Sequence, residues 1–263
     1  MDIYEFTRGN IPLVMSIPHV GEYIPPETEA QMTHAAAERS DTDWYLDRLY
    51  RDTATLGLYV LKANYSRYVI DLNRAPDNAS LYPGQNVTEL VPTSTFAEAP
   101  LYPAGQEPDD AEIARRLEIY WQPYHARLRE TLTALKNEHG YAVLFDCHSI
   151  KSLVPRFFDG RLPDFNLGTA GGVSCAPELR AELSNVLSRD DRYTLAVDGR
   201  FKGGYITRHY GDPDYNIHAF QLELSTATYM EEEPAVAWRE DLADQVRPNL
   251  IAMLEVAANW RPV

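Results

Sequence analysis

Short apolar runs alternate with longer segments of mixed character along this chain. The runs are rich in β-branched, leucine and aromatic residues, and such runs favour β-strands. They lie at residues 13–17, 58–62, 68–72, 142–147, 193–197 and 218–224. Segments typical of helices lie at residues 41–56, 109–139, 177–187 and 235–258. This alternation predicts an α/β fold, in which a mixed sheet is flanked by helices on both faces.

Local signals mark the ends of two of these helices. Ser40 or Asp41 can cap the first one, and Gly57 can end it. The longest segment, residues 109–139, has apolar side chains at every third or fourth position and is followed by a glycine. Pro123 lies inside this segment, so we expect the helix to be kinked or divided there.

Residues 75–108 follow neither pattern. They contain six prolines and two glycines, and no apolar period persists through them. A loop of this length inside a compact protein is usually functional or mobile, so it is a candidate for closing over a ligand. The chain has no repeat and no linker-like change of composition. We therefore expect a single domain over residues 1–263.

The composition and net charge of the chain limit the kinds of partner that we expect. The chain has 263 residues, 44% of them hydrophobic and 24% charged, which is typical of a globular protein. Its net charge of −15 argues against nucleic acid as a partner. We find neither an apolar run long enough for a membrane span nor a signal peptide, so we expect a cytoplasmic protein. The two cysteines are expected to be reduced and buried.

Candidate metal ligands follow two of the predicted strands. His19 comes after the first strand, and His148 comes at the end of the fourth. Ligands of open α/β sheets collect outside the carboxyl ends of strands, so these histidines can converge. Two histidines, one carboxylate and a water form the usual site of a catalytic zinc. The alternative is that each histidine is a polar residue satisfied within a turn. If the histidines bind a metal, Asp146 or the backbone could fix the tautomer of a ligating imidazole.

The third ligand is open at this point. His19 and Glu22 have the HxxE spacing of zinc carboxypeptidases, but two prolines at positions 25 and 26 keep this segment out of a helix. Asp43 is the rival, because it lies at the start of the next predicted helix. Asp43 could instead serve only as a favourable negative charge at the helix N-terminus.

Two basic segments could bind an anionic ligand. The stretch YSRYVIDLNR supplies Arg67, Asn73 and Arg74, whose guanidinium and amide groups suit a carboxylate. The stretch KGGYITRHYG supplies Arg208. Ordinary surface ion pairs are the alternative for Arg67 and Arg74. The alternative for Arg208 is a side chain that faces solvent.

Glu223 is the candidate general base. It lies in HAFQLELS, an otherwise apolar strand in which alternate residues share a face. Burial raises the pKa of a carboxyl group, and a raised pKa suits a base that activates water. A structural ion pair with an arginine is the alternative. We find neither a nucleotide-binding glycine motif nor a GxSxG nucleophile motif.

The motifs together resemble those of a known family. SIPHVGEYIP, SDTDWYLDRLY, YSRYVIDLNRAPD, LYPGQN, FDCHSIKS, GRLPDFNLGT, GRFKGGYITRHYG and HAFQLELS are similar, in this order, to N-formylglutamate amidohydrolases, also called N-formylglutamate deformylases. The resemblance implies a fold similar to that of zinc carboxypeptidases. It also implies hydrolysis of N-formyl-L-glutamate to formate and L-glutamate in histidine degradation, with a divalent metal, expected to be zinc.

The resemblance also assigns roles to residues. His19, His148 and Asp43, rather than Glu22, would bind the metal, and Glu223 would be the base. Asn73 and Arg74 would bind a carboxylate of this small dicarboxylate substrate, with Arg67 and Arg208 as further cationic contacts. The alternatives are an amidohydrolase for another N-acylated acidic amino acid, and a non-catalytic protein that binds acidic metabolites. Oligomeric state stays open.

Overall fold

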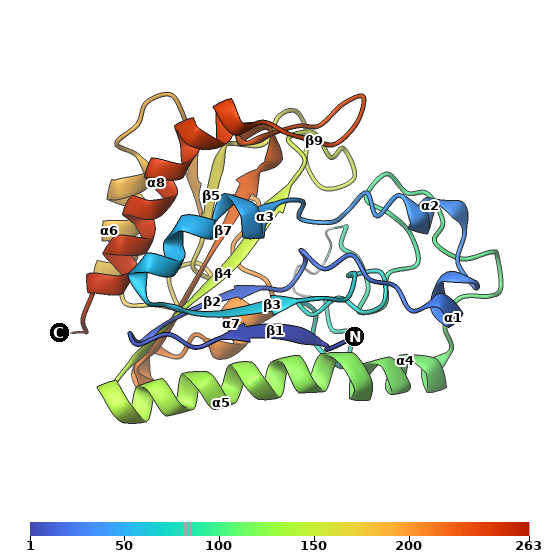
Figure 1. The fold of residues 1–263 in the computed structure, drawn as a ribbon, viewed down its shortest axis with the longest axis horizontal. Helices are drawn as coiled ribbons and strands as arrows, with labels where there is room; N and C mark the ends of the chain where they lie inside the picture. The colour runs from blue at the N-terminus through green and yellow to red at the C-terminus, as the bar shows by residue number, and fades with distance from the viewer. Residues whose placement is uncertain (81–83, 85, 263) are drawn as a thin grey trace.

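A seven-stranded mixed sheet forms the centre of the protein (Figure 1). The computed structural model describes residues 1–80, 84 and 86–262. The strand order is β1 (Tyr4–Thr7), β3 (Tyr59–Ala63), β2 (Leu13–Ile17), β4 (Ala142–Ile150), β7 (Ile217–Ser225), β5 (Phe165–Gly168) and β6 (Leu195–Val197). The four strands from β3 to β7 are parallel, whereas β1 and β5 run antiparallel to their neighbours β3 and β7. Strands β8 (Met230–Glu231) and β9 (Ala237–Trp238) form a separate small sheet.

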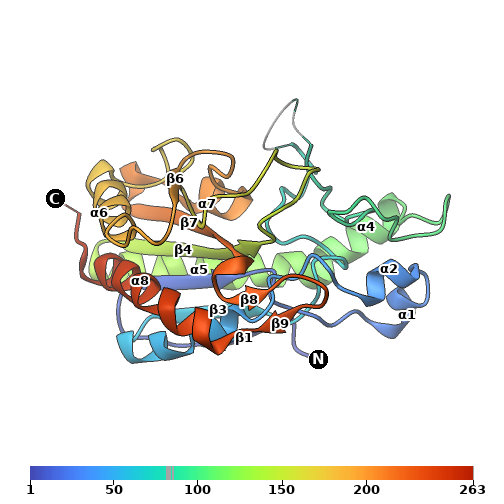
Figure 2. The ribbon, with the colours of Figure 1, turned by 90° about the horizontal axis from the view of Figure 1, so that it is seen from above.

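Helices cover both faces of the sheet, which confirms the predicted fold class (Figures 1 and 2). One face packs against α3 (Leu46–Leu49), α6 (Pro177–Leu187) and α8 (Glu240–Asn259). The other packs against α5 (Gln122–His139) and α7 (Tyr205–Tyr210). The short helices α1 (Pro26–Glu29) and α2 (His34–Ala37) lie at one end of the molecule, near α4 (Asp110–Arg116) (Figure 2). Among the described residues, none of the helices combines the length and apolar character that a membrane span requires.

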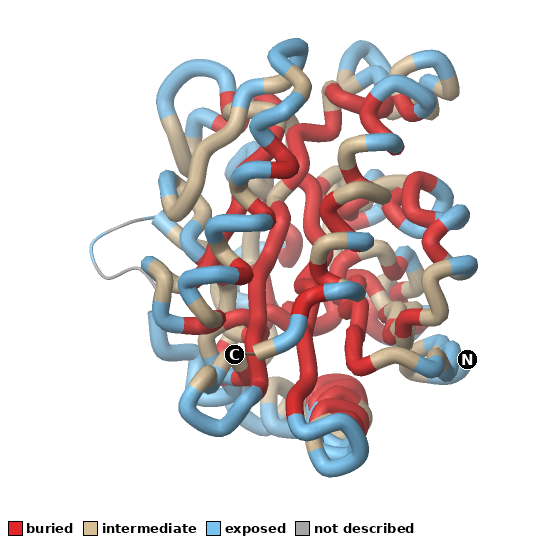
Figure 3. The backbone as a smooth tube through the Cα atoms, turned by 90° about the vertical axis from the view of Figure 1, so that its left-hand side faces the viewer, coloured by how far each residue is buried: buried red, intermediate tan, exposed pale blue. Residues whose placement is uncertain are grey.

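The central strands are buried on both sides, and Figure 3 shows them in red. In β4, Val143 and Phe145 pack toward α6 and α8, whereas Ala142 and Leu144 pack toward α5. The next two positions on the face of Leu144 are polar, Asp146 and His148. The same face of the sheet therefore changes from apolar core to polar site as the strand approaches its carboxyl end.

Two sequence predictions about local structure were wrong. Residues 68–72 form a buried turn instead of a strand, in which Val69 N donates to Ser66 O and Asp71 N donates to Leu90 O. The first predicted helix is reduced to α3 and the 3₁₀ helix η1 (Arg51–Leu56), because Tyr45 has a left-handed φ of 63°. Strands β1 and β5 were not predicted, since each has only four residues and gives a weak signal in the sequence.

The helix predicted over residues 109–139 is divided just before Pro123, as expected. The helices α4 and α5 are joined by one π-helical turn, η2 (Leu117–Trp121), and form one continuous rod (Figure 1). A proline has no N–H to donate to the preceding turn, and a wider turn placed just before Pro123 accommodates this loss. The rod ends at Gly140, whose φ of 84° only glycine adopts easily.

Candidate metal centre and active site

The sheet reverses its strand order around β2, which lies between β3 and β4. Such a reversal leaves a crevice at the carboxyl ends of the strands, where ligands bind in open α/β sheets. A cavity of about 220 Å³ lies there. Its lining includes His19, Asp43, Arg67, Asn73, Arg74, Thr88, Phe96, His148, Phe157, Arg200, Gln221 and Glu223. Residues 78–80 and 86–89 of the long loop also line it, whereas residues 81–83 and 85 of that loop and of the LYPGQN motif lie outside the described residues.

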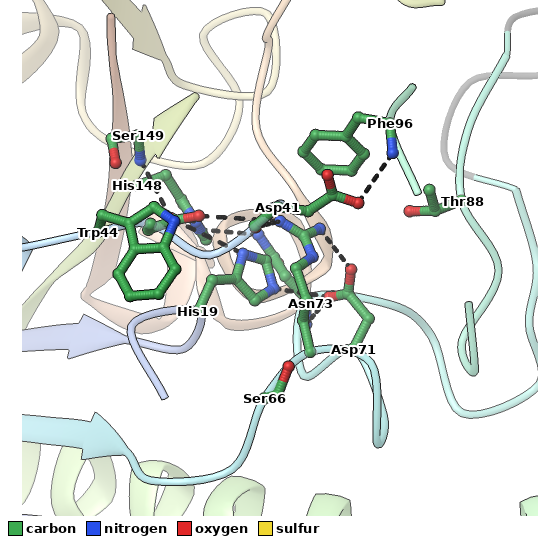
Figure 4. A network of polar contacts seen from close by, with 12 residues as sticks. His19, Asp41, Trp44, Ser66, Asp71, Asn73, Thr88, Phe96, His148 and Ser149 are labelled. Atoms are coloured by element: carbon green, nitrogen blue, oxygen red, sulfur yellow. Dashed lines mark hydrogen bonds and ion pairs between the residues drawn. The ribbon is translucent and has the colours of Figure 1, made fainter. Parts of the chain in front are cut away.

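Three buried side chains, those of His19, Asp43 and His148, converge in this cavity. Figure 4 labels the two histidines. The Nδ1 atom of His19 lies 3.9 Å from Oδ2 of Asp43, and the Nδ1 atom of His148 lies 3.4 Å from the same oxygen. One donor atom from each residue lies within 4.8 Å of the other two. Two imidazole nitrogens and a carboxylate oxygen are the donor set of a catalytic zinc site, so the residues fit a divalent cation.

Buried carboxylates hold the far side of both imidazoles. His19 Nε2 lies 2.7 Å from Asp71 Oδ1, and His148 Nε2 lies 3.0 Å from Asp146 Oδ2. Burial alone would raise the pKa of Asp71, but the positive charges of His19 and Arg67 hold it well below its usual value. A carboxylate behind a ligating histidine fixes the ring and keeps Nδ1 directed at the shared centre.

The segment that follows β2 positions Asp43. Its backbone N donates to His19 O at 3.0 Å, and its carboxylate Oδ2 accepts from Ser149 N at 3.0 Å. Asp43 is therefore tied to both elements that carry the histidines. Glu22, the other candidate ligand, is exposed and lies outside the converging group. The geometry favours Asp43.

The two histidines differ in proton affinity. Burial, followed by the charge of Arg67, lowers the pKa of His19. Burial also lowers the pKa of His148, but Asp146, Asp43 and Glu223 together outweigh it and hold this pKa well above its usual value. A cation that bound both rings would compete with a proton at His148.

Glu223 lies beside this centre. It pairs with His148 across the parallel strands β4 and β7, and it faces the cavity. Burial raises the pKa of Glu223 to about 8. This proton affinity, close to neutral pH, allows a carboxyl group both to accept and to donate a proton during a reaction.

Comparisons with known proteins identify the family of this chain. Residues 11–230 match the family model described as N-formylglutamate amidohydrolase. The chain belongs to this family. It is 46% identical over 259 residues to an N-formylglutamate deformylase of Pseudomonas aeruginosa, with 98% of this chain and 97% of the relative covered. It is 45% identical over 258 residues to one of Pseudomonas putida, with 98% and 96% covered.

Two solved structures share the fold. The N-formylglutamate amidohydrolase from Ralstonia eutropha JMP134 is similar with a TM-score of 0.83 and 24% identity, and 98% of each chain is covered. The gene product Atu2144 from Agrobacterium tumefaciens is similar with a TM-score of 0.72 and 15% identity, with 98% of this chain and 95% of that chain covered. These likenesses establish the fold, whereas similarity to zinc carboxypeptidases stays a prediction.

Three of the four residues expected to contact substrate line the cavity of this family member. Arg67 NH2 donates to Asp71 Oδ2 at 2.6 Å, and its NH1 lies 3.8 Å from Asp43 Oδ1. Arg74 donates from Nε and NH2 to the backbone and hydroxyl oxygens of Thr88, each at 2.8 Å. Arg208 does not line the cavity as the described residues define it, and its Nε donates to Gly203 O at 2.8 Å.

Asn73 has a different environment from the one expected of a substrate contact. Its Nδ2 lies 3.2 Å from Asp146 Oδ2 and 2.9 Å from His148 Nε2, and its Oδ1 accepts from Ile206 N at 2.8 Å. The side chain thus links α7 to the support of His148. Gly204 allows this approach, because a Cβ at that position would lie 2.2 Å from Asn73 Nδ2.

Several lining residues were not singled out from the sequence. Gln221 shares its strand face with Glu223, and its Oε1 accepts from Gly204 N at 2.8 Å. Arg200 lies in the GRFKGGYITRHYG motif, from which Arg208 was the predicted cationic contact. Phe96 and Phe157 come from stretches without a local pattern. Gln221 could have been found from the sequence, because it lies on the same face of its strand as Glu223. No pattern in the sequence indicated Phe96 or Phe157.

Proposed function

We propose that this protein is an N-formylglutamate deformylase, which hydrolyses N-formyl-L-glutamate to formate and L-glutamate. The observation that carries the proposal is the cavity in which a His19–Asp43–His148 donor set, a carboxyl group with a raised pKa and three arginines meet. The relatives with 46% and 45% identity bear this name. The family resemblance supports placing the reaction in histidine degradation and in the cytoplasm.

His19, Asp43 and His148 are the proposed metal ligands, with zinc as the expected ion. A divalent cation bound there would polarise the formyl carbonyl group and make a water molecule more acidic. Asp71 and Asp146 hold the two imidazoles in the orientation that this role requires.

Glu223 is the proposed group that carries a proton from the attacking water to the leaving nitrogen. It accepts a proton from the attacking water molecule while the water oxygen forms a bond to the formyl carbon. It then donates this proton to the leaving nitrogen as the C–N bond breaks, so that formate and the amine of L-glutamate are released. Its pKa of about 8, raised by burial, suits both transfers near neutral pH.

The arginines bind and stabilise negative charge. Arg67 is held by Asp71 at 2.6 Å and lies close to Asp43, so its position next to the ligand set suits the charge that develops on the formyl oxygen. Arg74 is oriented by Thr88 and lies one residue from Asn73 in the same wall. It is the proposed contact of the α-carboxylate, which is adjacent to the scissile amide.

Hydrolysis of N-formyl-, N-acetyl- and N-succinyl-L-glutamate by the purified protein tests the substrate. We expect the formyl compound to have the highest kcat/KM. If it were the poorest of the three, the protein would be an amidohydrolase for another N-acylated acidic amino acid. If glutamate bound but none of the three were hydrolysed, the protein would be a binding protein.

Metal removal tests the cofactor. Treatment with a chelator followed by dialysis should abolish hydrolysis, and addition of zinc should restore it. Activity that responded to neither treatment would remove the metal from the proposal and leave the substrate assignment intact.

A further inference from the structure

A small apolar cluster, separate from the two main cores, forms one wall of the cavity. It consists of Ile150, Val154 and Leu162, with Phe96, Phe157, Phe158 and Phe201 packed against them. Three of its rings, those of Phe96, Phe157 and Phe201, line the cavity. These rings support two guanidinium groups, because Arg67 lies 4.8 Å from the Phe96 ring centre and Arg200 lies 5.2 Å from that of Phe201.

The rings arrange these two arginines in order along the wall. The centres of Phe96 and Phe157 are 4.9 Å apart, and Arg200 lies 5.9 Å from the centre of Phe157. Arg67 is at the metal end, since its NH1 is 3.8 Å from Asp43 Oδ1. Arg200 follows beyond Phe157 and belongs to the segment after β6, which is far from the metal ligands in sequence.

The substrate carries its two carboxylates at different distances from the scissile bond. The α-carboxylate is attached next to the amide nitrogen, whereas the side-chain carboxyl carbon lies up to about 6 Å from the formyl carbon. Arg74 belongs to the metal end, because its NH1 is 3.9 Å from Asp71 Oδ2 and Asp71 holds His19. The remote carboxylate therefore needs a cation farther along the cavity.

We infer that Arg200 binds the side-chain carboxylate of the substrate and so selects glutamate over uncharged amino acids. The inference rests on the proposed function, because it assigns a contact to that substrate. Arg200 Nε donates to Phe157 O at 2.6 Å, and NH2 donates to Asn86 O at 3.4 Å. These two bonds hold the guanidinium against the wall of the cavity that Arg200 lines.

The apolar surroundings strengthen this contact. Phe157 and Phe201 flank the guanidinium and reduce the access of water, so an ion pair with a carboxylate is less screened there than at an open surface. A planar guanidinium can also bind both oxygens of a carboxylate at once. Arg200 thus takes the role that the sequence suggested for Arg208, whose Nε donates to Gly203 O outside the cavity lining.

The test compares N-formyl-L-glutamate with N-formyl-L-glutamine, which has the same shape but no side-chain charge. In Arg200→Gln we expect kcat/KM for the glutamate substrate to fall by about 10- to 100-fold, mainly through KM, since a hydrogen bond to a charged group is lost. For the glutamine substrate we expect a change of less than about threefold, because an amide makes only uncharged hydrogen bonds there. The inhibition constant of L-glutamate should rise with the KM.

Two further variants make the result specific. Arg208→Gln tests the rival residue, and Arg115→Gln on the exposed side of α4 is the control for removal of a surface charge. An equal loss on both substrates in Arg200→Gln, or a change of selectivity in Arg208→Gln in its place, would overturn the inference. If the wild-type protein hydrolysed neither substrate, the proposed function would fall. Calorimetric binding of L-glutamate to wild type and Arg200→Gln would then still decide the role of Arg200.

Discussion

The Nε2 atom of His19 lies 2.7 Å from Oδ1 of Asp71, and both side chains are almost completely buried. Asp71 also accepts from Arg67 at 2.6 Å, so one carboxylate joins a proposed metal ligand to a proposed stabiliser of negative charge. Because Asp71 lies in a buried turn instead of a strand, its position depends on the loop around it. The support of the metal centre is therefore built from the YSRYVIDLNR segment as much as from the sheet.

Asp71→Asn should weaken metal binding. The amide keeps the shape of the side chain but loses the negative charge that orients His19 and increases the basicity of its ring. Loss of such a partner typically lowers metal affinity by about 10- to 100-fold. Competition with a chromogenic chelator measures this affinity, and Asp47→Asn, at an exposed site where Asp47 pairs with Lys62, is the matched control. Equal affinities in the wild type and Asp71→Asn would contradict the proposed role.

Glu223→Gln should separate catalysis from metal binding. The amide cannot accept the proton of the attacking water, so kcat should fall by about 10²- to 10⁴-fold. Metal content should stay at the wild-type level, because the proposed ligands are His19, Asp43 and His148. Steady-state kinetics with metal analysis of the same sample gives both quantities, and Glu182→Gln on the exposed side of α6 is the control. A variant with normal turnover would exclude Glu223 as the base.

Gly204→Ala should disturb the site through Asn73. The added Cβ would lie 2.2 Å from Asn73 Nδ2, and Asn73 is held by Asp146 and by Ile206 N. Overpacking of this kind typically lowers the free energy of unfolding by about 1–3 kcal/mol. In an Asn73→Ala background the Cβ has space, so the cost of Gly204→Ala should shrink. Urea unfolding of the four proteins measures this coupling, and strictly additive effects would refute the clash.

His125 should make the protein less stable in acid. Burial lowers its pKa from 6.5 to about 3, and its ring bonds to Tyr210 and to Leu72 O. Between these values the unfolded chain binds a proton that the folded protein excludes, so the free energy of unfolding falls as the pH falls. The slope from this one group approaches about 1.4 kcal/mol per pH unit.

In His125→Gln this contribution is absent. Between pH 6 and pH 5 the variant should therefore lose about 1 kcal/mol less of its free energy of unfolding than the wild type. Urea unfolding at several pH values measures the difference, and His139→Gln at the exposed end of α5 should keep the wild-type profile. Parallel profiles for wild type and His125→Gln would show that His125 does not titrate in this range.

Much of the fold could be predicted from the sequence because its signals are local. Buried strands such as β2, β4 and β7 appear in the sequence as short apolar runs. The buried side of α5 appears as apolar residues spaced three or four positions apart. The bounds of α6, Pro177–Leu187, agree with the prediction. A turn that is as apolar as a strand has no distinguishing period, and this explains why residues 68–72 were assigned wrongly.

By itself, the sequence determined the alternating architecture and the residue types available for chemistry, because these follow from local patterns and motifs. Only the tertiary structure decided which of them meet. It brings Asp43, and not Glu22, to the two histidines, and it ties Asn73 to His148. It puts Arg200 in the cavity, whereas Arg208 lies outside the lining that the described residues form. Distances between residues far apart in the chain are set by how strands and loops pack, and a sequence pattern contains no measure of that packing.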